Sequence, residues 1–295
     1  MLLRDRYRRL TYWLIGLTAL SIALAWSAES SLIGAQRAKI GPPPADLPFE
    51  TIAFRSASGA TLRGWFLAGE PDSGAIILLH GVRANRLAML PRARWLHSLG
   101  YSVLLFDFQA SGESTGELIT VGYREALDAT AAVSYMKSRL PHERIGVIGT
   151  SMGGAAALLA KPPLPIDALV IEQVYPSIDK AVSDRLLIRL GGATWLTPAL
   201  LEALSWRIDV APNQLRPIDH IAGLTVPKLL LAGDIDQHTP IDESLSMYAA
   251  AASPKEIWIV KGAQHVDLFH YDESEYRYRV GAFLNKWLRP QPAKP

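Results

Sequence analysis

Short, wholly apolar runs alternate with amphipathic segments along most of this 295-residue chain. The clearest runs are Ala75–Leu79 (AIILL) and Ser102–Phe106 (SVLLF), and a segment with helical periodicity follows the first of them. A strand that is apolar on both faces belongs inside a sheet that helices cover on both sides. The alternation therefore predicts an α/β fold with a doubly wound, mostly parallel sheet.

This alternation also sets the expected order of elements. We expect a hairpin first, with strands at 51–55 and 61–67 around Ser58-Gly59. Further strands are expected at 75–79, 102–106, 144–149, 168–171, 228–232 and 256–260. Helices are expected at 87–99, with Pro91 in the first turn, and at 122–140, 152–161, 240–252 and 271–288. Sheets of this kind carry their chemistry at the carboxyl ends of the strands.

The N-terminal segment is typical of a membrane-targeting sequence. Residues 10–28 form an uncharged, apolar run after several arginines, and a helix of that length matches the hydrocarbon thickness of a bilayer. The arginines should stay cytoplasmic, so the body is expected outside the cytoplasmic membrane. We favour a signal anchor within residues 1–33, because the run exceeds the apolar core of most signal peptides. A cleaved signal peptide, which would make the protein secreted or periplasmic, is the alternative.

Residues 34–48 contain three consecutive prolines and are expected to form a stiff linker to a body at 49–290. The body has nearly balanced charge and no basic run, so nucleic-acid binding is not expected. The absence of cysteine excludes disulfides, thiolate metal sites and a catalytic cysteine. The histidines lack a metal-ligand spacing and no nucleotide-binding glycine motif is present, so we expect no metal and no organic cofactor. The sequence does not indicate an oligomeric state.

The sequence Gly149-Thr150-Ser151-Met152-Gly153-Gly154 lies between an expected strand and an expected helix. A serine in such a strand-to-helix turn takes a strained backbone conformation, and glycines on both sides let strand and helix approach while the hydroxyl stays accessible. The pattern G-x-S-x-G is common by chance, but it is specific in this setting. We therefore predict that Ser151 is a nucleophile. The alternative is a glycine-rich helix start in which Ser151 is only the N-cap.

A serine nucleophile needs a base and a carboxylate that orients the base, here in the chain order Ser, Asp or Glu, then His. Asp234 and Asp236 follow one expected strand, and His265 follows the next. We predict His265 as the base and Asp236 as the acid. Asp234, which can instead shape the turn by Asx hydrogen bonding, is the alternative. His238 is too close to Asp236 in the chain to face it across a site, and His270 is expected to begin the last helix.

An oxyanion hole needs two backbone N–H groups aimed at the developing charge. The residue after the nucleophile, Met152, supplies one of them. Val82 is expected to supply the other, because Gly81 permits a sharp turn after the strand at 75–79. His80 is expected to brace this loop rather than act as a base.

Together these motifs resemble the alpha/beta-hydrolase superfamily. They are His80-Gly81, Asp107 followed by Gly112 and Ser114, the GTSMGG turn, D-x-x-T-P from Asp236, and the G-A-Q-H sequence that ends at His265. Within the superfamily the chain is similar to the lysophospholipase, palmitoyl-thioesterase and serine-aminopeptidase-like branch over about residues 51–288. The resemblance implies the triad Ser151, Asp236 and His265 with the amides of Val82 and Met152, in agreement with the residues themselves.

The chain departs from the family at Gln109-Ala110, where D-x-R-G-x-G-x-S is usual, so a substrate contact inferred from that loop is in doubt. An insertion at 175–217 carries two Leu- and Trp-rich helical segments, 183–190 and 198–207, and predicts a small helical cap. The inner face of the cap would form an acyl pocket, or its apolar residues would simply pack the cap onto the sheet. No individual substrate-binding residue is predicted.

These features predict a serine hydrolase that cleaves a carboxylic ester or thioester of an acyl substrate through an acyl-enzyme on Ser151. One alternative is a serine peptidase, aminopeptidase-like enzyme or acyltransferase with the same triad. An aminopeptidase needs carboxylates for the substrate amine, and the acids of the insertion are scattered. A second alternative is a non-catalytic, membrane-tethered scaffold on the same fold, which the ordered triad argues against.

Overall fold

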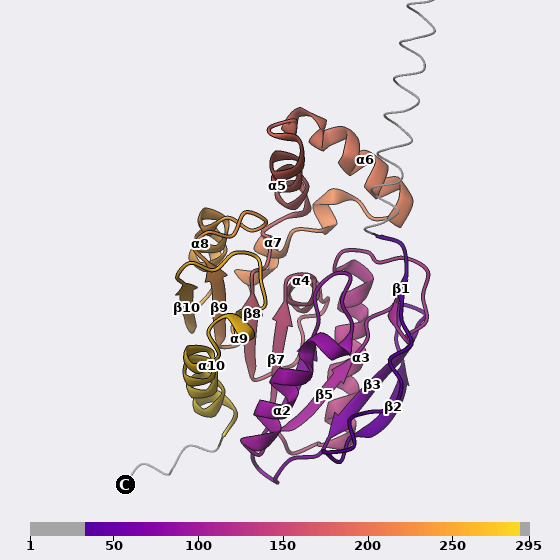
Figure 1. The fold of residues 1–295 in the computed structure, drawn as a ribbon, viewed down its shortest axis with the longest axis vertical. Coiled ribbons are helices and arrows are strands. Elements are labelled where there is room, and N and C mark those ends of the chain that lie inside the picture. Colours follow the sequence, from indigo (N-terminus) through magenta and orange to yellow (C-terminus); the bar gives the residue numbers. More distant parts are fainter. Residues whose placement is uncertain (1–32, 290–295) are drawn as a thin grey trace, which may run out of the picture.

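The computed structural model describes residues 33–289 and contains an eight-stranded sheet (Figure 1). The strand order is β10-β9-β8-β7-β4-β5-β3-β2, with β3 antiparallel to both of its neighbours and the other pairs parallel. The strands are β2 (Glu50–Arg55), β3 (Thr61–Leu67), β4 (Ala75–Leu79), β5 (Ser102–Phe106), β7 (Ile145–Thr150), β8 (Ala168–Glu172), β9 (Lys228–Gly233) and β10 (Lys255–Val260). The predicted mostly parallel sheet is confirmed, with small shifts at the strand ends.

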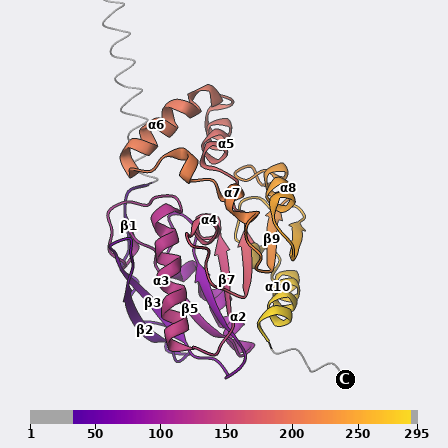
Figure 2. The same ribbon diagram turned by 180° about the vertical axis from the view of Figure 1, so that it is seen from behind.

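Helices cover both faces of this sheet (Figures 1 and 2). On one face pack α2 (Leu90–Ser98), α9 (Leu268–Tyr271) and α10 (Glu273–Leu288), and on the other α3 (Tyr123–Arg139), α4 (Met152–Leu159), α7 (Pro217–Ile221) and α8 (Ile241–Ala250). Each face has its own apolar core. In β4, Ile77 and Leu79 join one core while Ile76 and Leu78 join the other. Side chains alternate along a strand, which is why AIILL can be apolar throughout.

The helices lie within a few residues of their predicted bounds, and two of them begin differently for a visible reason. The segment expected at 87–99 begins as a 3-10 turn, η1 (Arg86–Met89), and α2 follows it. Pro91 lies in the first turn of α2 as predicted, where its missing N–H removes no helical hydrogen bond. The helix expected at 271–288 is α10, which begins at Glu273 because the Asp272 side chain accepts a hydrogen bond from the backbone N of Glu275 and caps it. A separate short helix, α9, precedes it. His270 therefore lies in α9 and does not begin the last helix.

The segment expected to be a linker lies against the body. A short strand in it, β1 (Gln36–Arg37), pairs in parallel with β6 (Ser111–Gly112). Asp46 forms an ion pair with Arg94 of α2. Over these residues the chain is part of the body surface rather than a free spacer.

The apolar run of the predicted signal anchor, residues 10–28, lies outside the described part of the chain. Within residues 33–289, no helix combines the length and the apolar character needed to cross a bilayer.

The insertion forms two main helices at one end of the molecule (Figure 1). They are α5 (Ile178–Leu190) and α6 (Thr197–Ile208), joined through the 3-10 turn η2 (Thr194–Leu196), and a further turn, η3 (Pro212–Gln214), leads into α7. The helices pack against each other. Some of their apolar side chains are buried in the core, namely Ile178, Ala181, Leu204 and Ile208. Others are exposed, namely Leu187, Leu190, Trp195 and Trp206.

Candidate active site

Ser151 lies in a sharp turn between β7 and α4. Its backbone φ of 50° and ψ of −114° are a combination that residues with a side chain rarely adopt. A Cβ on Gly149 would lie 2.6 Å from the backbone N of Gly154, and one on Gly153 would lie 2.4 Å from the carbonyl O of Leu79. Both glycines are therefore needed for the close approach of strand and helix. Ser151 is at the N-cap position of α4, but its side chain makes no capping hydrogen bond, so helix capping does not account for the serine there and its role as nucleophile stays a prediction.

Asp236 and His265 lie in the loops that follow β9 and β10, with Asp236 Oδ2 2.7 Å from His265 Nδ1. Burial acts to raise the pKa of Asp236, but the hydrogen bond and charge of His265 and the hydrogen bonds from Thr239 outweigh it and lower that pKa. The ionised carboxylate keeps the proton on Nδ1 and leaves Nε2 to accept one. Asp234 has a different position, because its Oδ1 accepts a hydrogen bond from the backbone N of Gly262 at 2.5 Å.

Ser151 and His265 line one cavity of about 300 Å³. The apolar lining side chains are Val82, Ala84, Ala88, Met89 and Val266. Within the described residues no hydrogen bond joins the Ser151 hydroxyl to His265, and catalytic hydrogen bonds are often long before substrate binds. The described residues hold no cluster of three or more His, Asp or Glu side chains suited to a metal ion.

The cap contributes a charged side chain to this cavity, not an apolar wall. Among residues 175–217, Arg185 lines the cavity, whereas no apolar side chain of α5 or α6 belongs to its lining. The lining of this cavity therefore does not support an acyl pocket on the inner face of the cap, which stays a prediction. Packing onto the sheet accounts for the buried cap residues, and the apolar lining comes from residues 82–89 and Val266.

The two residues predicted to form the oxyanion hole flank Ser151. Met152 is the first residue of α4, and the first N–H groups of a helix have no partner inside it. Val82 lines the cavity, and a Cβ on Gly81 would lie 3.7 Å from the Cβ of Ser151, so this loop passes close to the serine. Their roles as hydrogen-bond donors to substrate stay a prediction.

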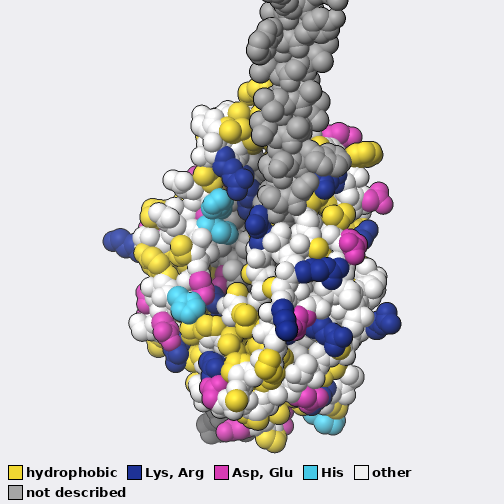
Figure 3. Space-filling model, turned by 45° about the vertical axis from the view of Figure 1, so that its right-hand side comes forward, with side chains coloured by type: hydrophobic (Ala, Val, Ile, Leu, Met, Phe, Trp, Pro, Cys, Tyr) yellow, Lys and Arg dark blue, Asp and Glu magenta, His cyan; other side chains and the backbone are white. Residues whose placement is uncertain are grey.

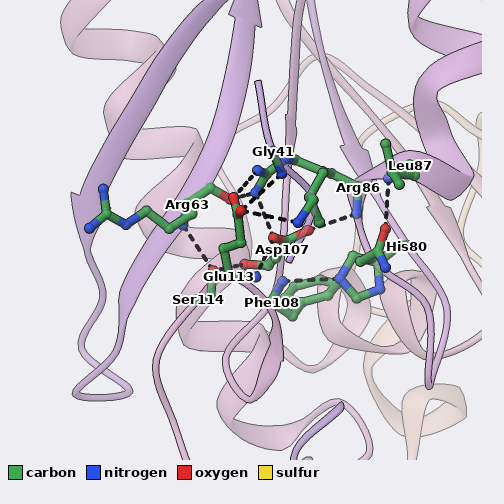
Figure 4. Close-up of polar contacts among 11 residues, drawn as sticks. Gly41, Arg63, His80, Arg86, Leu87, Asp107, Phe108, Glu113 and Ser114 are labelled. Carbon is green, nitrogen blue, oxygen red and sulfur yellow. Dashed lines mark hydrogen bonds and ion pairs between the residues drawn. The ribbon is translucent and has the colours of Figure 1, made fainter. Parts of the chain in front are cut away.

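His80 braces the loop that carries Val82. Its Nε2 accepts a hydrogen bond from the backbone N of Phe108 at 3.0 Å (Figure 4). Its Nδ1 donates to the carbonyl O of Gly81 at 2.8 Å. Burial lowers the pKa of His80 to about 4, although the bond to Gly81 opposes the shift. The ring is therefore neutral at pH 7, and both of its nitrogens are engaged.

The loop at 107–114, where the sequence departs from the family pattern, supports the same region from behind. Asp107 and Arg86 form a buried ion pair with Nη1 and Oδ2 2.6 Å apart, and Arg86 also pairs with Glu113 (Figure 4). Gln109 is 2% exposed and is hydrogen-bonded inside the fold. None of residues 107–114 lines the cavity, so the replacement of Arg-Gly changes a structural loop rather than a substrate contact there.

Comparisons with known proteins agree with this geometry. A family model described as "Serine aminopeptidase, S33" matches residues 70–202. An esterase of Pyrococcus furiosus has a TM-score of 0.72 and 26% identity, covering 86% of this chain and 98% of that one. Protein YqkD of Bacillus subtilis is 27% identical over 78% of this chain and 77% of its own length. An uncharacterized protein of Mycobacterium tuberculosis is 30% identical over 83% of both chains. The chain belongs to the alpha/beta-hydrolase superfamily.

In this hydrolase Gln173 joins the acid loop to the base loop, a role that the sequence patterns did not predict. It directly follows β8, with a φ of 51°. Its Nε2 donates to Asp236 Oδ2 at 3.0 Å and to the carbonyl O of Gln264 at 2.6 Å. The signal was present in the sequence, because a polar residue at the carboxyl end of a buried strand lies where such sheets place their chemistry.

His238 and Arg185 also line the cavity without having been predicted to do so. The ring of His238 lies 5.3 Å from that of His265, and its backbone N donates to Asp236 Oδ1 at 2.7 Å. Burial lowers the pKa of His238, and the charges of Arg185 and His265 act in the same direction. On the sequence alone, His238 is excluded as the base because it is too close to Asp236 in the chain. That proximity does not exclude a position for His238 beside His265 in the cavity.

A carboxylate pair between the cap and the body gives the hydrolase a predicted pH dependence of stability. Glu243 of α8 is 8% exposed, and burial, followed by the charge of Asp184 in α5, raises its pKa to about 7 from its ordinary value of 4.5. The folded protein therefore keeps this proton up to about pH 7, whereas the unfolded chain loses it near pH 4.5. Unfolding releases a proton in that window, so stability falls as pH rises through it.

Replacing Glu243 by Gln should remove this loss. We expect the Tm of Glu243→Gln to exceed that of the wild type by about 2–5 °C at pH 8 and to match it near pH 4.5. Calorimetry at both pH values measures the difference. Glu202→Gln, at an exposed position in α6, is the control and should show no such pH-dependent gain. An equal gain at both pH values would mean that ionisation of Glu243 is not the cause.

Proposed function

We propose that this hydrolase cleaves a carboxylic ester or thioester through an acyl-enzyme on Ser151. The observation that carries the proposal is the pair of Asp236 Oδ2 and His265 Nδ1, 2.7 Å apart, beside the cavity that Ser151 lines. The strained turn at Ser151 and the similarity to an esterase of Pyrococcus furiosus support it further.

In the proposed reaction Ser151 Oγ attacks the acyl carbon while His265 Nε2 takes its proton. Asp236 stabilises the resulting imidazolium, and the N–H groups of Val82 and Met152 hold the oxyanion. The C–O or C–S bond then breaks, and His265 returns the proton to the leaving alcohol or thiol. Water attacks the acyl-enzyme with His265 again as base, which releases the acid and restores the serine hydroxyl.

A panel of p-nitrophenyl esters from acetyl to dodecanoyl tests the proposal. We expect wild-type kcat/KM to rise by up to about fourfold for each methylene that the apolar lining covers, since burial of one CH₂ contributes about 0.8 kcal/mol. The rise should end at about hexanoyl, because a cavity of about 300 Å³ is at the small end for ligand sites. Acetyl as the best substrate, or a steady rise to dodecanoyl, would contradict this placement of the acyl chain.

The aminopeptidase alternative needs a free carboxylate for the substrate ammonium. Asp267 is the acid that lines the described cavity, and it is already paired with Arg92 at 2.6 Å and with His270 at 2.6 Å. Arg185 adds a positive charge that would repel an ammonium group. In the same panel, alanine p-nitroanilide should therefore turn over far more slowly than the butanoyl ester, and the reverse ranking would favour a peptidase.

We also propose that residues 10–28 hold the body at the outer face of the cytoplasmic membrane. The uncharged run after the N-terminal arginines supports this, and so do Trp195 and Trp206 of the cap, which are 77% and 79% exposed and are of a type enriched at bilayer surfaces. We expect the full chain in bacteria to resist carbonate extraction and to be digested by protease added to spheroplasts. Protection from that protease would place the body inside the cell.

A further inference from the structure

The cavity that Ser151 lines contains one arginine that forms no ion pair with an acid of the described residues. Arg185 of α5 lines the cavity together with Ser151, His238 and His265. Its Nη1 donates to the carbonyl O of Ala181, one turn earlier in the same helix, at 2.8 Å, and its guanidinium forms no ion pair with an acid of residues 33–289. A guanidinium has five N–H donors, so most of this group remains available to a ligand.

The other cation of the lining is neutralised inside the fold. Arg92 is 1% exposed and forms ion pairs with Glu172 at 2.7 Å and Asp267 at 2.6 Å. The acid of the site, Asp236, is engaged by His265, Thr239 and Gln173. Arg185 is thus the arginine of the described lining that forms no ion pair.

The remaining charged groups around Arg185 do not supply a partner. The charges of Asp184 on the same helix and of Asp236 favour the charged guanidinium, but neither carboxylate forms an ion pair with it, and Arg189 adds positive charge. Burial lowers the pKa of Arg185, which means that its surroundings penalise the positive charge. Figure 3 shows Lys and Arg side chains around a group of His side chains, on a face of the molecule beside the cap. An anion that enters the cavity would stabilise the charged guanidinium through charge-assisted hydrogen bonds.

We propose that Arg185 binds an anionic oxygen group, a carboxylate or phosphate, carried by the ester that Ser151 cleaves. This inference rests on the proposed function and names the substrate class. Carboxylate and phosphate match the planar fork of a guanidinium, which can donate two parallel hydrogen bonds to either. The apolar lining at 82–89 would hold the uncharged part of the same substrate.

Matched pairs of esters test the proposal and report which side of the ester carries the charge. On the acyl side, p-nitrophenyl hydrogen adipate is compared with p-nitrophenyl hexanoate. On the alcohol side, 4-acetoxybenzoate is compared with its methyl ester. For each pair the ratio of kcat/KM, charged to neutral, is measured in wild type and in Arg185→Gln. In one of the two pairs we expect this ratio to fall by about 10- to 100-fold in the variant, the size of a charge-assisted hydrogen bond.

The control is Arg189→Gln, an exposed arginine one turn further along α5 that does not line the cavity. It should leave the ratios of both pairs within about twofold, because Arg189 does not line the cavity and an exposed charge is screened by salt. Arg185→Lys keeps the charge but loses the fork, and should recover part of the ratio. Unchanged ratios in Arg185→Gln for both pairs would overturn the proposal.

A binding measurement separates this inference from the proposed function. Calorimetric titration of monomethyl adipate into Ser151→Ala and into Ser151→Ala/Arg185→Gln requires no turnover. We expect the double variant to bind monomethyl adipate at least about tenfold more weakly than Ser151→Ala does. If wild type hydrolyses no ester of the panel but this difference in affinity is found, the proposed function fails and the anion site stands. If hydrolysis depends on Ser151 but the two affinities are equal, the proposed function stands and the anion site fails.

Discussion

Ser151→Ala should lose at least about 10⁴-fold in kcat/KM toward p-nitrophenyl butanoate, because it removes the attacking oxygen and leaves only binding and the oxyanion donors. Labelling by a fluorophosphonate probe should disappear with the activity. The side chain makes no capping hydrogen bond and its Cβ is retained, so we expect the Tm to change by no more than about 2 °C. The rate, the labelling and the Tm are measured on the same preparations.

Ser177→Ala is the matched control for this prediction. Ser177 is 3% exposed, precedes α5 and does not line the cavity, so its loss should leave labelling intact. Persistent hydrolysis by Ser151→Ala at wild-type rates would mean that another group attacks the ester. Absence of labelling and turnover in the wild type itself would favour the scaffold alternative.

The sequence allowed the fold to be predicted because its strongest patterns are local. The strand AIILL is apolar throughout and both faces of its sheet are covered, so pattern and environment agree. The turn at Ser151 could be located for a similar reason, since Gly149 and Gly153 each lie where a Cβ would collide with backbone. A steric requirement of that kind leaves a residue type in the sequence.

Long-range features of the site left no comparable signal. Arg185 reaches the cavity because of how the cap packs over the sheet, and its spacing in α5 is that of any helical residue. The apolar residues of the cap indicated burial but not against what, and several are exposed. The segment at 34–48 looked like a spacer by composition, yet its short strand β1 pairs with β6, which lies far along the chain. Composition does not encode such a pairing.

The choice between Asp234 and Asp236 leads to the second large effect that we expect. Asp236→Asn should lower kcat by about 10⁴-fold, because the asparagine would hold His265 in the wrong tautomer. The backbone N–H groups of His238 and Thr239 both donate to Asp236 Oδ1, at 2.7 and 3.1 Å. They would keep the asparagine oxygen at that position and direct its NH₂ group toward His265 Nδ1, at the cost of the hydrogen bonds that Oδ2 accepts from Gln173 and Thr239 in the wild type. The proton would then move to Nε2, which could no longer accept one from Ser151.

Asp234→Asn is the control, because the same chemical change is made two residues away. Asp234 accepts a hydrogen bond from the backbone N of Gly262 and has no bond to His265, and an asparagine oxygen can accept that bond as well. We therefore expect its kcat to stay within about tenfold of wild type, with the pH profile of kcat measured for both variants. A pH profile of kcat in Asp236→Asn with the wild-type shape but a much lower maximum would fit a His265 ring held in the wrong tautomer. Equal losses in the two variants would assign Asp236 a structural role and reopen the identity of the acid.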